Sequence, residues 1–228
     1  MQKLDSYDGD WALYMKNPYT GEEIEINSHQ MTAASLIKLY IMAAFFEREQ
    51  QGGVNLSDEN RDLLEKMITV SDNSSSNDIV RQIGGGDTAD GREIVNVFCQ
   101  SKGFNDTRQN RDLGVAQNVQ NYTSVRDVGA LLEVIYREKC ISGIADRYML
   151  DLLRDQQLKN KIPAGVPEGV IVANKTGELE KIENDAAIVF SPGGDYILCI
   201  MSSNLDSEEK GRERIVEISA LIYAYFNP

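Results

Sequence analysis

Residues 33–46 read AASLIKLYIMAAFF, an almost wholly apolar run with a single charged side chain, that of Lys38. A helix that is apolar all round is buried rather than laid on a surface, so we expect a central buried helix from Ser35 to about Gln50. The run ends at Glu47 and falls short of the roughly 18 residues that a membrane-spanning helix needs. The remaining elements are therefore expected to pack around this helix.

Strand-like segments flank a helical middle. The predicted strands are Trp11–Met15, Glu22–Ile26, Val170–Ala173, Ala186–Phe190 and Tyr196–Ser202. Strands from both chain ends most simply share one antiparallel sheet, with the helices inserted between them. We therefore expect an α+β fold of three layers (α/β/α) with a five-stranded antiparallel sheet. One domain over residues 1–228 is predicted, with a sheet part of about 1–30 and 165–228 and a helical part of about 31–164.

Charge and cysteine content exclude several classes of protein. The 228 residues carry a formal net charge of −13, and Lys and Arg are scattered, so no basic stripe predicts a nucleic-acid partner. Three cysteines without a C-x-x-C pair and one histidine cannot supply the usual four ligands of zinc. We expect buried thiols, no metal and no organic cofactor.

Ser35 and Lys38 stand three residues apart at the start of the predicted helix. Residues at this spacing share a helix face, about 5–6 Å apart at Cβ, so the amine can reach the hydroxyl. An apolar environment favours the neutral amine, and a neutral amine beside a hydroxyl is a general base for a nucleophile. Alone, this common spacing is better explained by a helix start with an incidental lysine.

Two later segments follow this pair in a fixed order: residues 71–73, SDN, and residues 175–177, KTG, just before a predicted hairpin. Ser-x-x-Lys, Ser-Asp-Asn and Lys-Thr-Gly form the motif set of serine β-lactamases and penicillin-binding proteins. The chain resembles that superfamily, and specifically its members with the class A β-lactamase fold, over most of residues 10–226. Further similar stretches are VSDNSSSNDIVRQIGG, TSVRDVGALLEVIY and NDAAIVFSPGGDYILCIM.

The resemblance implies four catalytic residues. Ser35 is expected to be the acylated nucleophile, and Lys38 its base or part of the relay that activates it. Ser71, aided by Lys175, is expected to pass a proton to the leaving nitrogen.

The resemblance also implies four substrate-binding residues, Asn73, Thr176, Gly177 and Glu178. Asn73 is expected to hydrogen-bond Lys38 or the substrate amide, and Thr176 with the neighbouring lysine to receive a substrate carboxylate. The backbone N–H groups of the nucleophile and of Glu178 are expected to form the oxyanion hole.

One departure from the family lies in the stretch TRQNRDLGVAQNVQNYTS. Class A β-lactamases carry here a glutamate that activates the water which releases the acyl group. Leu113 occupies its position with Asp112 beside it, and no glutamate occurs between Glu93 and Glu133. Loss of a general base is expected to slow deacylation by about 10²–10⁴. Replacement of the base by Asp112 through a shift of register stays open.

A second departure is the pair Glu178 and Glu180, which would share one face of a strand. If this face looks into the cleft, the carboxylates oppose a substrate carboxylate and suit a cationic or amide-rich ligand. If it looks outward, they are ordinary charges on an edge strand. Both interpretations stay open.

The resemblance thus implies an active-site serine hydrolase that forms an acyl-enzyme on Ser35 with a β-lactam or a D-Ala-type amide and deacylates slowly. A penicillin-binding DD-peptidase and a non-catalytic sensor of β-lactams or peptidoglycan stay open as alternatives. The expected partner is a small-molecule β-lactam or a peptidoglycan-type peptide, and the expected state is a monomer or weak oligomer. An extracytoplasmic or secreted location follows from the family, although MQKLDSYDGD does not resemble a signal peptide.

Overall fold

The computed structural model describes residues 4–116 and 118–228. Its main sheet is antiparallel, with the strand order β2-β1-β7-β6-β5. These strands are β1 (Asp10–Lys16), β2 (Glu23–Ile26), β5 (Ile171–Leu179), β6 (Ile182–Phe190) and β7 (Tyr196–Ser203). The first strand of the chain pairs with the last, so the predicted five-stranded sheet built from both chain ends is confirmed.

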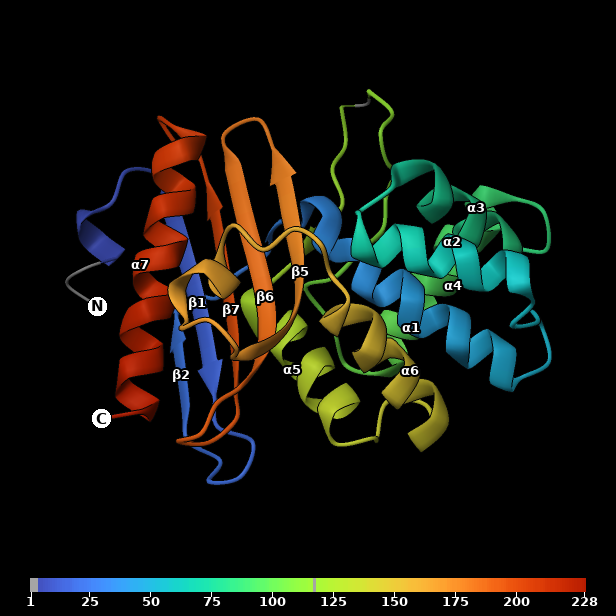
Figure 1. The fold of residues 1–228 in the computed structure, drawn as a ribbon. Coiled ribbons are helices and arrows are strands. Elements are labelled where there is room, and N and C mark those ends of the chain that lie inside the picture. The colour runs from blue at the N-terminus through green and yellow to red at the C-terminus, as the bar shows by residue number, and fades with distance from the viewer. Residues whose placement is uncertain (1–3, 117) are drawn as a thin grey trace.

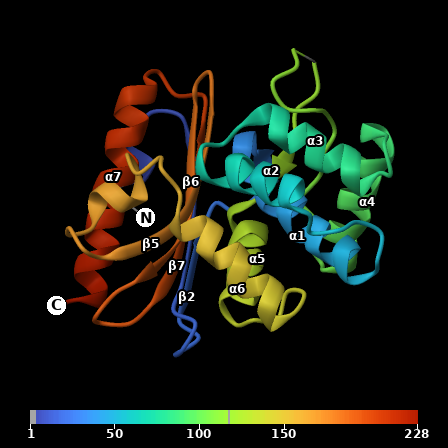
Figure 2. The same cartoon turned by 45° about the vertical axis from the view of Figure 1, so that its right-hand side comes forward.

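The helices form the two outer layers (Figures 1 and 2). They are α1 (Ile37–Gln50), α2 (Asp58–Thr69), α3 (Asn73–Ile83), α4 (Thr88–Ser101), α5 (Val125–Tyr136), α6 (Gly143–Arg154) and α7 (Glu208–Phe226). Helix α7 covers one face of the sheet, and the other six helices lie on the opposite side. The three-layer arrangement is therefore confirmed.

Helix α1 is the centre of the helical layer. Every residue from Ile37 to Phe46 is buried, and this includes Lys38. One apolar core joins α1 to its neighbouring helices and to one face of the sheet, and a second lies between the other face and α7. The first core therefore fixes the helix that carries Lys38 against the sheet.

Side-chain caps explain where several helices begin. The Asp72 carboxylate accepts a hydrogen bond from the Ser75 backbone N–H at 2.6 Å, and α3 starts at Asn73. The Ser124 hydroxyl caps α5 by accepting from the Asp127 N–H at 3.2 Å. A capping side chain thus draws the polar residues 73–77 into a helix despite their poor helical propensity.

Two features of the sheet differ from the predictions. The β5–β6 hairpin continues to the pair Leu179↔Ile182, so residues 175–177 lie within strand β5, which was predicted to end at Ala173. A small antiparallel ribbon of β3 (Met31–Thr32) and β4 (Tyr122–Thr123) was not predicted from the sequence. Two-residue strands carry no detectable alternation, so the sequence gives no signal for them.

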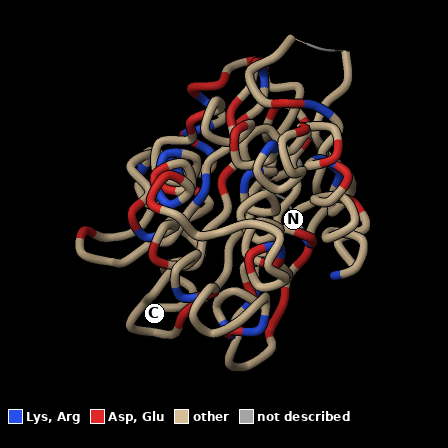
Figure 3. Tube along the Cα trace, turned by 90° about the vertical axis from the view of Figure 1, so that its right-hand side faces the viewer, with Lys and Arg blue, Asp and Glu red and all other residues tan. Residues whose placement is uncertain are grey.

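The distribution of charged residues and the state of the cysteines agree with what the composition predicts. In Figure 3, acidic and basic residues are interspersed along the chain trace. Cys99, Cys140 and Cys199 are free and buried. None of the helices in the described ranges has the length and apolar character required to cross a membrane.

Candidate active site

Ser35 lies in a short 3₁₀-helix, η2 (Ala34–Leu36), that leads directly into α1. The preceding residue, Ala34, has φ of +48°, a left-handed conformation that is costly for a residue with a Cβ. The edge of β5 packs against this turn at Gly177, where an added Cβ would stand 3.0 Å from the Ala33 carbonyl oxygen and 3.3 Å from the Ser35 nitrogen. Glycine therefore lets the strand approach the candidate nucleophile closely.

Lys38 lies one turn further into the fold and is fully buried. Its Nζ donates to the Asn73 Oδ1 at 2.9 Å, to the Ser71 carbonyl oxygen at 2.5 Å and to the Ser71 Oγ at 3.2 Å. Burial lowers the pKa of Lys38 from its ordinary value to about 7, against a smaller opposing effect of the Asp72 charge. A substantial fraction of this amine is therefore unprotonated at neutral pH.

The side chain of Ser71 connects helix α1, which carries Lys38, to strand β5, which carries Lys175. Ser71 stands just before α3 with φ of +60°, a second strained backbone conformation in the same site. Its Oγ receives a hydrogen bond from the Lys175 Nζ at 2.8 Å and another from the Lys38 Nζ at 3.2 Å. One hydroxyl thus lies between two lysine amines.

Lys175 reaches this hydroxyl from strand β5 and is also fully buried. Its second hydrogen bond goes to the carbonyl oxygen of Thr176 at 2.9 Å. Burial and then the nearby Lys38 charge hold the pKa of Lys175 well below its ordinary value. The two amines oppose each other's ionisation, so protonation of one favours the neutral form of the other.

The three predicted segments therefore meet in space, but one predicted contact differs. No hydrogen bond between the Ser35 Oγ and the Lys38 Nζ is present among the described residues, since the amine bonds Ser71 and Asn73 instead. Hydrogen bonds of catalytic groups are often long before substrate binds. The roles of these residues stay predictions.

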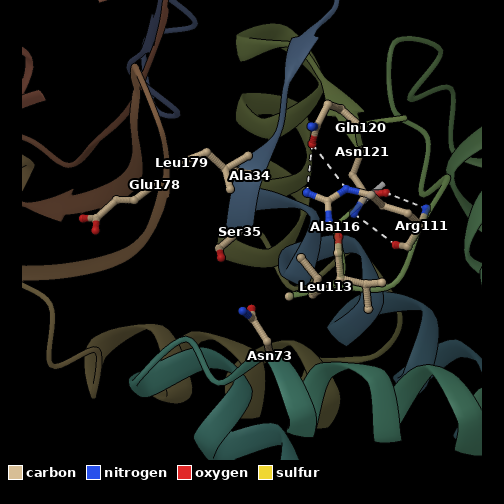
Figure 4. A pocket seen from close by; sticks show the side chains of 12 residues that line it. Ala34, Ser35, Asn73, Arg111, Leu113, Ala116, Gln120, Asn121, Glu178 and Leu179 are labelled. Carbon is tan, nitrogen blue, oxygen red and sulfur yellow. Dashed lines mark hydrogen bonds between the residues drawn. The ribbon is translucent and has the colours of Figure 1, made fainter. Parts of the chain in front are cut away.

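A cleft of about 360 Å³ opens in front of Ser35 (Figure 4). This volume suits a small molecule or the end of a peptide. The residues that line it are Ala34, Ser35, Asn73, Arg111, Leu113, Gly114, Val115, Ala116, Gln120, Asn121, Glu178 and Leu179. Figure 4 shows Leu179 on one side of the serine hydroxyl and Arg111 on the other, with Asn73 reaching up from α3.

The loop wall of the cleft presents hydrocarbon where the family resemblance places a carboxylate. Leu113 lines the cleft, and the side chain of Asn77 holds its backbone through two hydrogen bonds of 2.8 and 2.9 Å. Asp112 does not line the cleft, because its carboxylate is bound to Arg92 on α4. The position of Asp112 is therefore unfavourable for activating a water in front of Ser35.

On the opposite side of the cleft, the structure shows where the side chain of Glu178 points. The side chain of Glu178 is about half exposed and makes an ion pair of 3.0 Å with Lys161. Lys161 is fully buried and also pairs with Glu183 of β6 at 2.5 Å. Figure 4 shows the Glu178 carboxylate directed away from Ser35. This charge is thus partly neutralised and does not point at the nucleophile.

Sequence reasoning missed two basic residues of this region. Lys161 belongs to a polar run, KNK, that resembles an exposed loop, and only the folded sheet shows it to be buried. Arg111 was noted only as part of the loop, although its side chain lines the cleft. His29 is exposed and contacts the Asn27 carbonyl oxygen at 2.6 Å, and it does not line the cleft.

Comparison with known families and proteins agrees with this geometry. Residues 1–61 and 59–226 match the model of a family described as the beta-lactamase enzyme family. A beta-lactamase of Bacillus licheniformis is 26% identical over 161 residues, which cover 68% of this chain and 52% of the relative. A beta-lactamase of Streptomyces cellulosae is 30% identical over 147 residues, 60% of this chain and 45% of the relative. The chain spans about half the length of these curated relatives.

Solved structures show the same fold. The structure of PBP-A superposes with a TM-score of 0.89 at 26% identity and covers 99% of this chain and 93% of its own. A beta-lactamase from Sphaerobacter thermophilus gives a TM-score of 0.88 at 21% identity, covering 99% and 94%. A variant of PBP-A, solved as an acyl-enzyme complex with penicillin G, gives a TM-score of 0.88 at 25% identity, covering 99% and 95%.

Proposed function

The chain belongs to the beta-lactamase enzyme family, and we propose that it is a serine hydrolase in which a β-lactam or D-Ala-type amide acylates Ser35. The observation that carries the proposal is the meeting of Lys38 and Lys175 at the Ser71 hydroxyl, beside Ser35. Two buried amines around one hydroxyl form a path along which a proton can pass. The penicillin G acyl-enzyme of the PBP-A variant, at 25% identity, supports acylation as the reaction.

The first step needs a base for Ser35. Lys38 has a pKa of about 7, so its neutral amine can accept the hydroxyl proton as the Ser35 oxygen bonds to the substrate carbonyl carbon. Backbone N–H groups of Ser35 and Glu178 are proposed to stabilise the oxygen that becomes negative. The close approach of β5 at Gly177 supports this arrangement.

The second step returns the proton to the leaving group. The Ser71 hydroxyl donates to the substrate nitrogen as the carbon–nitrogen bond breaks, and it regains a proton from Lys38. Lys175, hydrogen-bonded to the same oxygen, stabilises the transient negative charge on Ser71. Asn73 orients the Lys38 amine, and Thr176 with Lys175 receives a substrate carboxylate.

Release of the acyl group is proposed to be slow. A water in front of Ser35 would face Leu113, which cannot accept a proton, while Asp112 is bound to Arg92. Loss of a general base costs about 10²–10⁴ in rate. The protein is therefore proposed to behave more like a penicillin-binding protein than like a rapid β-lactamase. A cell-wall peptide as natural substrate would place it outside the cytoplasm.

Acylation and turnover can be measured separately. We expect a fluorescent penicillin to label the protein and intact mass to show a stable adduct on one residue, with little sustained hydrolysis of nitrocefin. Ser35→Ala should lose the adduct completely, whereas Ser74→Ala, an exposed serine on the neighbouring helix α3, should keep it. Sustained nitrocefin hydrolysis would show that deacylation is fast, and a protein that takes no label would overturn the proposed reaction.

A further inference from the structure

Arg111 is a buried cation on the loop wall of the cleft without an acidic partner. Only 8% of its surface is exposed, and it makes no ion pair with any described Asp or Glu. The adjacent Asp112 is bound to Arg92 instead. In a chain with a net charge of −13, an arginine buried without a counter-ion calls for an explanation, because burying a charge costs free energy unless it is paired.

The partners of this guanidinium are all neutral oxygens. Nε and Nη2 both donate to the Gln120 Oε1, at 3.3 and 2.9 Å. Nη1 donates to the backbone oxygens of Val115 and Asp112, at 2.6 and 3.4 Å. The two donors that converge on one amide oxygen form the planar fork that binds a carboxylate through two parallel hydrogen bonds. A carboxylate could replace the Gln120 oxygen and bring the missing charge.

The side chain is placed where a substrate can reach it. Arg111 and Gln120 both line the cleft, and Figure 4 shows the guanidinium extending from the loop toward Ala34 and Ser35. The loop shape does not depend on this side chain alone, because Asn121 holds the Arg111 backbone through hydrogen bonds of 3.0 and 3.2 Å. The guanidinium can therefore exchange partners while the loop keeps its course.

We propose that Arg111 is a specificity-determining residue that binds a carboxylate on the acyl side of the substrate. This inference rests on the proposed function, in which a first carboxylate binds Lys175 and Thr176 on strand β5, across the cleft from Arg111. The preferred substrate class is thus a dianion: a β-lactam or peptide amide with one carboxylate near the bond that breaks and a second on its acyl substituent. Glu178 does not oppose the second charge, since it pairs with Lys161 and points away.

A matched pair of penicillins tests this preference. Carbenicillin is benzylpenicillin with a carboxylate added to the side-chain carbon, so the ratio of their acylation rates isolates that charge. We expect Ser35 to react with carbenicillin roughly 10-fold faster or more, which corresponds to one charge-assisted bidentate contact in a partly solvated cleft. General damage to the loop would slow both reactions and leave the ratio unchanged.

Three variants assign the preference to the guanidinium. Gln120→Glu supplies an internal carboxylate to Arg111 and preserves the contact with its two donors. This variant should bring the ratio of the carbenicillin and benzylpenicillin acylation rates to about one. Arg111→Gln should do the same, whereas Arg111→Lys should restore part of the preference. Arg108→Gln removes an exposed arginine of the same loop that contacts Asn110 and should keep the wild-type ratio. A wild-type ratio of one or less, or a ratio that persists in Gln120→Glu and Arg111→Gln, would overturn the inference.

Binding to Ser35→Ala separates this inference from the proposed function. Calorimetry on that variant measures the affinity for each penicillin without any covalent step. Preferential binding of carbenicillin that Gln120→Glu abolishes supports the carboxylate site even if the wild-type protein is never acylated. Equal acylation by both penicillins keeps the proposed function and rejects the carboxylate site. Absence of both binding and acylation rejects both proposals.

Discussion

The two walls of the cleft differ in what their side chains can do. On the first wall, made of largely buried side chains that do not themselves line the cleft, Ser71 lies between the amines of Lys38 and Lys175 in one hydrogen-bonded group. On the other, the loop presents the hydrocarbon of Leu113 and neutral amides, with its arginine held by Gln120. In the proposed reaction the first wall moves protons during acylation, whereas none of the described residues that line the second wall is a base for a water. The comparison teaches that the proposal treats the two halves of a hydrolytic cycle as separable.

The sharpest way to break this comparison is to disable the first wall. Lys38→Met keeps a long apolar stem in the buried position and removes the amine, so the acylation rate constant should fall by about 10²–10⁴. Stopped-flow measurement with a fluorescent penicillin gives this rate. Lys66→Met, an exposed lysine on α2, is the matched control and should change it little. Acylation at the wild-type rate in Lys38→Met would show that the base lies elsewhere.

The converse change adds a base to the second wall. Leu113→Glu places a carboxylate on a backbone already held by Asn77, and we expect the acyl-enzyme to deacylate about 10²-fold faster, the lower end of the range for a general base. Loss of the penicillin adduct over time, followed by intact mass, measures the effect. Leu113→Gln has nearly the same shape without a base and should leave the lifetime long. Equal lifetimes in both variants would contradict the proposed role of this position.

The first wall should also titrate. The pKa of Lys38 is lowered to about 7, so the neutral amine increases as pH rises through that value. The acylation rate constant should therefore rise about tenfold between pH 6 and pH 8 and then level off. Labelling rates from pH 5 to pH 9 test this, with unchanged circular dichroism as the check on folding. A rate that stays flat or falls over this interval would exclude a neutral amine as the base.

The smallest effect is expected at Asp112. Its carboxylate is bound to Arg92 in a partly exposed ion pair, so Asp112→Asn should lower the free energy of unfolding by about 0.2–1 kcal/mol. The lifetime of the acyl-enzyme should not change, because this carboxylate does not line the cleft. Urea denaturation and adduct decay measure the two quantities. Markedly slower deacylation in Asp112→Asn would instead identify this residue as the missing base.

Much of this architecture could be predicted from local sequence signals. The apolar run of α1, the β-branched strands and the three motifs each carry a pattern within a few residues, and the shared sheet followed from their order. The β3–β4 ribbon could not be predicted, because Met31–Thr32 and Tyr122–Thr123 are too short to show a period. The start of α3 at Asn73 depends on a capping carboxylate that outweighs the low helical propensity of serine and asparagine, so propensity alone does not predict it.

The sequence predicted which three motif segments would meet, but neither their contacts nor most of the residues that line the cleft. Ser35, Lys38 and the segments at 71–73 and 175–177 were identified from their types and order. The hydrogen-bond acceptors of the Lys38 amine are set by the course of α3 and β5 in space. The contact of this amine with Ser71 therefore could not be derived from the three-residue spacing of Ser35 and Lys38. The burial of Lys161 and the unpaired charge of Arg111 are likewise properties of the folded chain.

The pairing of β1 with β7 has a consequence for how the chain is made. Asp10 and Ser203 are partners in the sheet although 193 residues separate them. At roughly 5–20 residues per second, a ribosome needs about 10–40 seconds to synthesise that interval. The β1–β2 hairpin meanwhile has no third strand and is marginally stable in water. Closure of the sheet is therefore a late, long-range event that limits the folding rate, and nascent chains that stop before β7 are prone to aggregate.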